Sequence, residues 1–168
     1  TPPPPAEARA RSRWEARDVA GLAYAVVKAS LPRARGAHAA RDALLASISD
    51  VSDSVLPLCG CEDVANLAWA YGLGAPGATP LWRALGARLP AIAAQLQPCE
   101  LAAVSSALAR AQRAAAGAPP VGADALGALS IRAAKLAERM PLQELCLVTS
   151  AFACLLYTSD AADEEDSV

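Results

Sequence analysis

Apolar residues recur along this chain at the three- and four-residue spacing of one helix face. In EDVANLAWAYGLG, residues 62–74, the side chains of Val64, Leu67 and Tyr71 fall on one side of a helix. Breaks rich in proline or glycine separate such segments, and no segment reads convincingly as a strand. The pattern predicts an all-α chain of seven helices. They are expected at 15–29, 38–55, 62–73, 80–95, 98–115, 123–139 and 141–153.

Prolines and a threonine suggest where several of these helices begin. Thr79 is expected to cap a helix whose first residue is Pro80. Pro98 and Pro141 suit a first helical position, where the missing N–H costs nothing. Pro90 falls inside a segment and is expected to kink or split it.

Four of the segments share one pattern of bulky and small residues. Their starting points, Val19, Val64, Leu101 and Leu145, are separated by 45, 37 and 44 residues. Positions three and seven residues further on are also bulky, whereas positions one, four and six further on are small. The bulky residues are Leu22, Leu67, Val104, Val148, Val26, Tyr71, Leu108 and Phe152, and the small ones are Ala20, Ala65, Ala102, Cys146, Ala23, Ala68, Ser105, Thr149, Ala25, Ala70, Ala107 and Ala151.

A helix with a bulky stripe beside a small stripe can bury two sides, one against its partner helix and one against the next repeat. Each spacing is long enough for two helices and two turns. The expected architecture is therefore an α-α superhelix, or solenoid, of three helix pairs and the first helix of a fourth, about three and a half repeats. This helical-repeat domain is expected to span residues 15–153.

The two ends of the chain differ from this domain. Residues 1–14 contain four consecutive prolines followed by arginines, which predicts an extended Pro/Arg-rich linker. Residues 154–168 are acidic, and the codons for 154–164 can be written as a transposon-derived sequencing adapter read in frame. We therefore expect this tail to be an artefact, the alternative being a disordered acidic tail.

Removing the tail changes the charge. The whole chain has 15 basic and 17 acidic residues, a net charge of −2, and five of the acids lie in the tail. The remainder has 15 − 12 = +3, and 13 of its basic residues are arginine. Such a body is compatible with a polyanionic partner.

Other chemistry finds little support. His38 is the only histidine, and Cys59, Cys61 and Cys99 would need a fourth ligand to hold zinc, so we expect neither a metal nor another cofactor. No phosphate loop, nucleophile elbow or carboxylate pair is present, so we expect no enzymatic activity. Five irregularly spaced cysteines suit reduced thiols better than disulfides. No uncharged apolar run reaches the length needed to cross a membrane.

The segments 62–74 and QELCLVTSAFACL, residues 143–155, resemble the recurring first helix of octotricopeptide-type repeats and of FAST-kinase-like and RNA-editing substrate-binding complex proteins. Helices of these families typically carry an acidic or Gln-rich start, then Leu-Ala-Asn, and then Trp-Ala or Phe-Ala. The regular octotricopeptide spacing is 38 residues, from which the spacings here depart. The resemblance implies a protein that binds single-stranded RNA in a mitochondrion or plastid, in RNA processing, editing, stability or translation, with organellar ribosomes or RNA-processing proteins as further partners. Some resembling proteins also carry a nuclease-like domain.

If the array binds RNA, readout should come from positions two, five and nine of each repeat, on the face that packing leaves open. Asn can pair with a base edge, aromatic rings can stack on bases, and cations can meet phosphate. The candidate RNA-binding residues are Tyr24, Lys28, Asn66, Trp69, Ser106, Arg110 and Arg113.

Each candidate also has a structural interpretation. Trp69 recurs in the resembling helices, which favours packing over base selection, and Asn66 can bond a neighbouring backbone group. Lys28, Arg110 and Arg113 are also typical of a solvated face. The alternative function is a HEAT-like or armadillo-like scaffold that holds a protein partner, for example as a ribosome-associated subunit.

Overall fold

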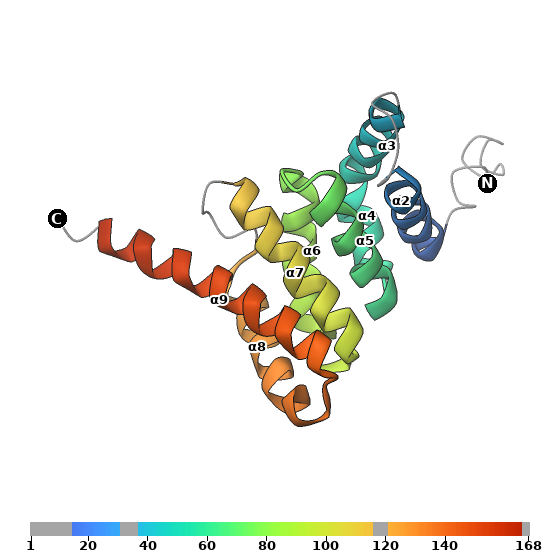
Figure 1. Ribbon diagram of the computed structural model, residues 1–168. Coiled ribbons are helices and arrows are strands. Elements are labelled where there is room, and N and C mark those ends of the chain that lie inside the picture. Colours follow the sequence, from blue (N-terminus) through green and yellow to red (C-terminus); the bar gives the residue numbers. More distant parts are fainter. Residues whose placement is uncertain (1–14, 31–36, 116–120, 166–168) are drawn as a thin grey trace, which may run out of the picture.

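A computed structural model describes residues 15–30, 37–115 and 121–165 (Figure 1). The predicted linker, residues 1–14, the breaks at 31–36 and 116–120, and residues 166–168 lie outside the described residues. Every regular element within the described ranges is a helix, so the all-α prediction is confirmed. None of these described helices is both long and apolar enough to span a membrane.

The helices form two rows. The front row consists of α2 (Ala16–Ser30), α5 (Cys61–Gly74), α7 (Pro98–Ala114) and α9 (Leu142–Glu165). The back row consists of α3 (Ala37–Asp50), α4 (Ser52–Val55), α6 (Thr79–Ile92) and α8 (Ala123–Leu136). Short 3-10 turns end the back-row segments: η1 (Leu56–Leu58), η2 (Ala93–Gln95) and η3 (Ala137–Arg139).

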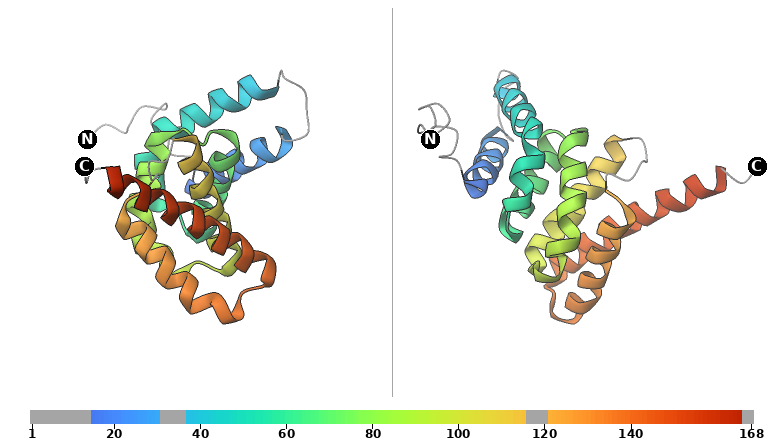
Figure 2. Two further views of the ribbon diagram at one scale, coloured as in Figure 1. Left: turned by 60° about the vertical axis from the view of Figure 1, so that its left-hand side comes forward. Right: turned by 180° about the vertical axis from the view of Figure 1, so that it is seen from behind.

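Contacts between neighbouring helices define each row. In the front row α5 packs against α2 and α7, and α7 packs against α9 (Figure 2). In the back row α6 contacts α3, α4 and α8. Arg17 of α2 lies near Asp63 of α5 where both helices begin, and Tyr24 of α2 meets Trp69 of α5 further along, so these two helices run in the same direction.

The bulky and small positions of the shared pattern are not buried to the same extent in every front-row helix. The bulky residues of α5 and α7 are all buried, and the Tyr71 hydroxyl donates a hydrogen bond to the Leu45 carbonyl of α3. Burial, together with Asp50, raises the pKa of Tyr71. The small residues one and four positions after each starting point are buried in α2, α5 and α7 but exposed in α9. The small residue six positions after the starting point is exposed in α2 and buried in the other three helices. The first two positions therefore face the next helix, and the third faces the previous one.

Small residues let the central helices approach closely. A Cβ atom placed on Gly72 of α5 would lie 2.8 Å from the Cβ and 2.9 Å from the Cα of Ala107 in α7. Both distances are far below van der Waals contact, and one of the atoms belongs to the backbone. The α5–α7 interface therefore requires glycine at this position.

A recurring arginine joins the two rows. Arg88 of α6 donates hydrogen bonds from Nε and Nη2 to the carbonyl of Cys59, at 3.2 and 2.8 Å. Arg132 of α8 donates the same pair to Leu96, at 2.8 and 2.7 Å. Cys59 and Leu96 are the extended residues that link one repeat to the next front-row helix. We call each such contact a linker clamp.

Several helix boundaries differ from the sequence prediction. Thr79 does not cap α6 as predicted, because the N-cap is Ala78 and the Thr79 side chain makes no capping bond. Pro90 lies inside α6 and does not split it, but the helix ends two residues later at Ile92, where the 3-10 turn η2 begins. Val51 divides the segment predicted at 38–55. Helix α9 passes the expected end at Ala153 and continues to Glu165, with Leu155 buried.

We expect Gly72→Ala to lower the free energy of unfolding by about 1–3 kcal/mol, because its methyl group overlaps α7. Gly21→Ala in α2 is the matched control. An added methyl there has nothing within 4 Å, so it should raise the free energy of unfolding by about 0.5–1 kcal/mol. Urea unfolding followed by circular dichroism measures both changes. Equal effects of the two substitutions would contradict the close approach of α5 and α7.

Candidate ligand-binding face

Two aromatic rings meet between the first two helices of the front row. The ring centroids of Tyr24 in α2 and Trp69 in α5 lie 4.7 Å apart, with the ring planes at 44°. Lys28, one turn beyond Tyr24, places its Nζ 5.2 Å from the Tyr24 centroid and 3.3 Å from the Tyr24 hydroxyl. Each ring is half-buried, so Trp69 packs against a neighbouring repeat and also remains partly accessible.

Two adjoining grooves follow this row. The first, of about 380 Å³, lies between α2, α5 and α7, and the second, of about 290 Å³, lies between α5, α7 and α9. Trp69, Cys99 and Ala103 line both grooves. The first groove is completed by Tyr24, Glu62, Ala65, Asn66 and Glu100, and the second by Ala102, Ser106, Arg110, Gln143, Glu144 and Leu147.

Five of the seven candidate RNA-binding residues line these grooves, namely Tyr24, Asn66, Trp69, Ser106 and Arg110. Lys28 lies at the Tyr24 end. Arg113, one turn beyond Arg110 in α7, lines neither groove and places its Nη1 3.5 Å from Cys154 Sγ in α9. The structure therefore gathers five of the candidates, Tyr24, Asn66, Trp69, Ser106 and Arg110, along the two grooves.

The structural interpretation of Asn66 was a hydrogen bond to a neighbouring backbone group, and Asn66 makes no such bond. Within the described ranges its side chain makes no hydrogen bond to the protein. It is half-buried and lines the first groove. The amide is therefore available to a ligand.

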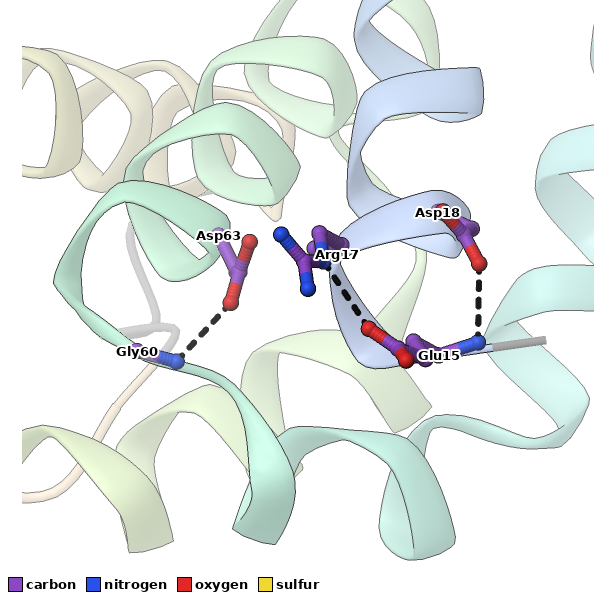
Figure 3. Close-up of polar contacts among 5 residues, drawn as sticks. All are labelled: Glu15, Arg17, Asp18, Gly60 and Asp63. Atoms are coloured by element: carbon purple, nitrogen blue, oxygen red, sulfur yellow. Dashed lines mark hydrogen bonds and ion pairs between the residues drawn. The ribbon is translucent and has the colours of Figure 1, made fainter.

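The starts of α2, α5 and α7 each carry an acid that accepts a hydrogen bond from the N-cap backbone. Asp18 Oδ2 accepts from the Glu15 N–H and Asp63 Oδ2 from the Gly60 N–H, both at 3.0 Å (Figure 3). Glu100 Oε2 accepts from the Gln97 N–H at 2.7 Å. These bonds satisfy donors that the helix itself leaves unpaired.

Arg17 adds a cation between the first two of these helix starts. Its Nε donates to Glu15 Oε2 at 2.9 Å, and its guanidinium points toward Asp63 (Figure 3). Hydrogen bonding and attraction to Glu15, with a smaller contribution from Asp63, raise the pKa of Arg17.

Glu144 occupies the equivalent position in α9, but the backbone N–H that would donate a hydrogen bond to it is missing. The residue three positions before it is Pro141, which has no N–H. Glu144 Oε2 is buried and has no hydrogen-bond partner among the described residues, and the same holds for Ser106 Oγ in the same groove. Two residues that line the second groove therefore each hold a buried oxygen, one carboxylate and one hydroxyl, without a hydrogen-bond partner among the described residues.

Acidic and basic side chains lie toward opposite ends of the front-row helices on this face. Acids stand at the N-terminal ends of the front-row helices, where Glu62, Glu100 and Glu144 line the grooves. The cations Lys28 and Arg110 stand toward the C-terminal ends. Sequence reasoning missed the three acids as groove residues, although an acidic helix start was visible in the repeat pattern.

The cysteines form no cluster. Cys59 is buried, Cys61 is half-buried and Cys99 is exposed, and no metal-binding group of three or more His, Cys, Asp or Glu residues exists in the described part of the chain. Burial is the main cause that raises the pKa of Cys59 to about 11, with Asp63 adding to it and Arg88 opposing it. Burial and then Glu100 raise the pKa of Cys61.

Comparison with protein-family models, with curated proteins and with solved structures finds no match for this chain. The face is therefore interpreted from its own geometry and from the repeat pattern.

Thiol labelling tests the burial around the linker. At pH 8 a maleimide should modify exposed Cys99 and Cys146 at least about tenfold faster than Cys59, because only the thiolate reacts and a raised pKa keeps Cys59 protonated. The Cys59 rate should then rise with pH until about 11. Peptide mapping by mass spectrometry gives each rate, and unfolding in urea is the control. Equal rates in the native protein would contradict the buried linker.

Proposed function

We propose that this chain is a helical-repeat RNA-binding protein, an α-solenoid whose front row holds single-stranded RNA. The observation that carries the proposal is the meeting of Tyr24, Trp69 and Arg110 along two adjoining grooves. Aromatic side chains stack on bases and arginine binds phosphate, so the face offers both contacts that a single strand needs. A role in organellar RNA processing, editing, stability or translation rests on the repeat resemblance.

The division of charge supports one orientation of the strand. Phosphates would be repelled by Glu62, Glu100 and Glu144, so the sugar-phosphate backbone follows the C-terminal side of the front row, near Lys28 and Arg110. Bases then point toward the acids and Trp69. Carboxylates accept hydrogen bonds from the amino groups of bases.

In the second groove the free groups favour guanine. Its Watson–Crick edge presents two adjacent N–H donors and one carbonyl acceptor. Glu144 supplies a carboxylate for the donors and Ser106 a hydroxyl for the acceptor. No other standard base has two adjacent donor groups on that edge.

A protein partner is the second candidate function, and the same three acids favour it. An aromatic ring beside carboxylates also binds arginine or lysine side chains of a basic peptide segment. Binding of a basic peptide without binding of RNA would support this scaffold function.

Filter binding with single-stranded RNA tests the leading proposal. Replacing Lys28, Arg110 and Arg113 by alanine should weaken binding and reduce the slope of log K against log salt by up to about 2, since single strands give about 0.7 per phosphate contact. The matched control replaces one lysine and two arginines of the back row, Lys135, Arg83 and Arg139. No binding at low salt, or equal loss in both variants, would refute the proposal.

A second experiment tests the base preference. Replacing one guanosine by inosine removes the 2-amino group, so we expect binding to fall about tenfold in the native chain and by much less in Glu144→Gln. Glu62→Gln, which changes a carboxylate of the first groove only, is the control. RNA binding that ignores this replacement would reject guanine recognition and leave RNA binding itself intact.

A further inference from the structure

The first groove contains an amide without a hydrogen-bond partner. Asn66 is the only asparagine of the chain and lies inside α5, where asparagine is a poorer helix former than the alanines around it. Its side chain is half-buried, lines the groove and makes no hydrogen bond to another described residue. Neither of its polar atoms is among the buried, unpartnered atoms of the described residues, so both stay accessible. The amide therefore offers an acceptor and two donors to a ligand.

Acidic side chains lie beside this amide. Glu62 precedes Asn66 by one turn on the same face of α5, and Glu100 lines the groove from α7. Glu100 Oε2 accepts the hydrogen bond from the Gln97 N–H, which leaves Oε1 as a further acceptor. None of the described residues that line the groove carries a positive charge. The groove therefore favours hydrogen-bond donors and disfavours carbonyl oxygens.

Adenine matches these groups better than the other standard bases. Its 6-amino group has two donors, one for the Asn66 carbonyl and one for a carboxylate, and the adjacent ring nitrogen accepts from the Asn66 amino group. Asparagine recognises adenine through two such hydrogen bonds in nucleic-acid complexes. Guanine, cytosine and uracil each carry a carbonyl oxygen, which the glutamates of the groove would repel. Adenine carries none.

Aromatic rings supply the surface on which a base can stack. Trp69 follows Asn66 by three residues on the same side of α5, and its ring meets that of Tyr24. Both rings are half-buried and line the groove, so their open faces remain available to a base. The groove volume of about 380 Å³ lies within the range of small-ligand sites.

We propose that the first groove selects adenine, with Asn66 as the specificity-determining residue. This selection rests on the proposed function, in which the front row binds single-stranded RNA. The base stacks on Trp69, and its 6-amino group donates to Asn66 Oδ1 and to a glutamate of the groove. Asn66 Nδ2 donates to the ring nitrogen beside that amino group. The phosphates lie on the opposite side, toward Lys28.

Two other occupants fit this groove less well. Cytosine also has an amino group beside an accepting ring nitrogen, but its carbonyl oxygen adjoins that nitrogen and would face the acidic groove. An arginine side chain of a basic peptide would satisfy Glu62 and Glu100, but a guanidinium has no acceptor for the Asn66 amino group. The unpartnered amide therefore favours a base with both a donor and an acceptor.

Binding of RNA oligomers made of a single base tests this selection. The probes are single-stranded oligo(A), oligo(C) and oligo(U) of equal length and charge, and fluorescence anisotropy at low salt measures their binding to the full chain. We expect oligo(A) to bind at least about tenfold more tightly than the other two, because of the two-bond contact to the base. Replacing each adenosine by purine riboside, which lacks the 6-amino group, should remove this advantage.

Variants of the chain locate the contact. Asn66→Leu removes both hydrogen bonds with little change in side-chain volume, so oligo(A) should bind about tenfold more weakly and no better than oligo(C). Gln143→Leu, which changes an amide of the second groove only, is the matched control and should keep the preference for oligo(A). Circular dichroism establishes that both variants fold, and the purine riboside oligomer tests the same contact in the native chain.

The outcomes separate adenine selection from RNA binding itself. Equal binding of the three oligomers, tightest binding of oligo(C), or a preference for oligo(A) that survives in Asn66→Leu would overturn adenine selection and leave RNA binding intact. Absence of binding by every oligomer would overturn the proposed function, and adenine selection with it.

Discussion

The close approach of the front-row helices controls the rest of this structure. Gly72 lies against Ala107, and small residues occupy the neighbouring positions of the same interfaces. Because so little side-chain volume separates α5 from α7, their bulky residues turn toward the back row and form the core there. The side opposite that core is left for the two grooves, so one packing constraint fixes both the interior and the candidate site.

Much of this arrangement follows from periodicity in the sequence. The equivalence of Val64 and Leu101 predicts helices of the same orientation, and both residues are buried as expected. The offsets that place Asn66, Trp69 and Ser106 on one face also place them along the grooves. Residue spacing is enough for such predictions because a helix has a fixed number of residues per turn.

Hydrogen bonds between side chains and the backbone could not be predicted from residue spacing. The linker clamps of Arg88 and Arg132 use carbonyl acceptors, which every residue carries, so no residue type marks them in the sequence. Thr79 was misplaced for a related reason, since whether a threonine caps a helix depends on the backbone just before it. The pairing of Tyr24 with Trp69 depends on the register between two repeats of unequal spacing, which the pattern of one repeat does not determine.

The linker clamps also bear on how this chain tolerates change. Since a carbonyl cannot be removed by exchanging one side chain for another, half of each clamp is immune to point mutation and only the arginine is vulnerable. The repeats of 37 and 44 residues differ in the front-row helix and the turn after it, whereas the repeat of 45 residues is longer mainly in its back-row segment, α3 to η1. The length difference between the second and third repeats therefore leaves the back-row helix and its clamp unchanged.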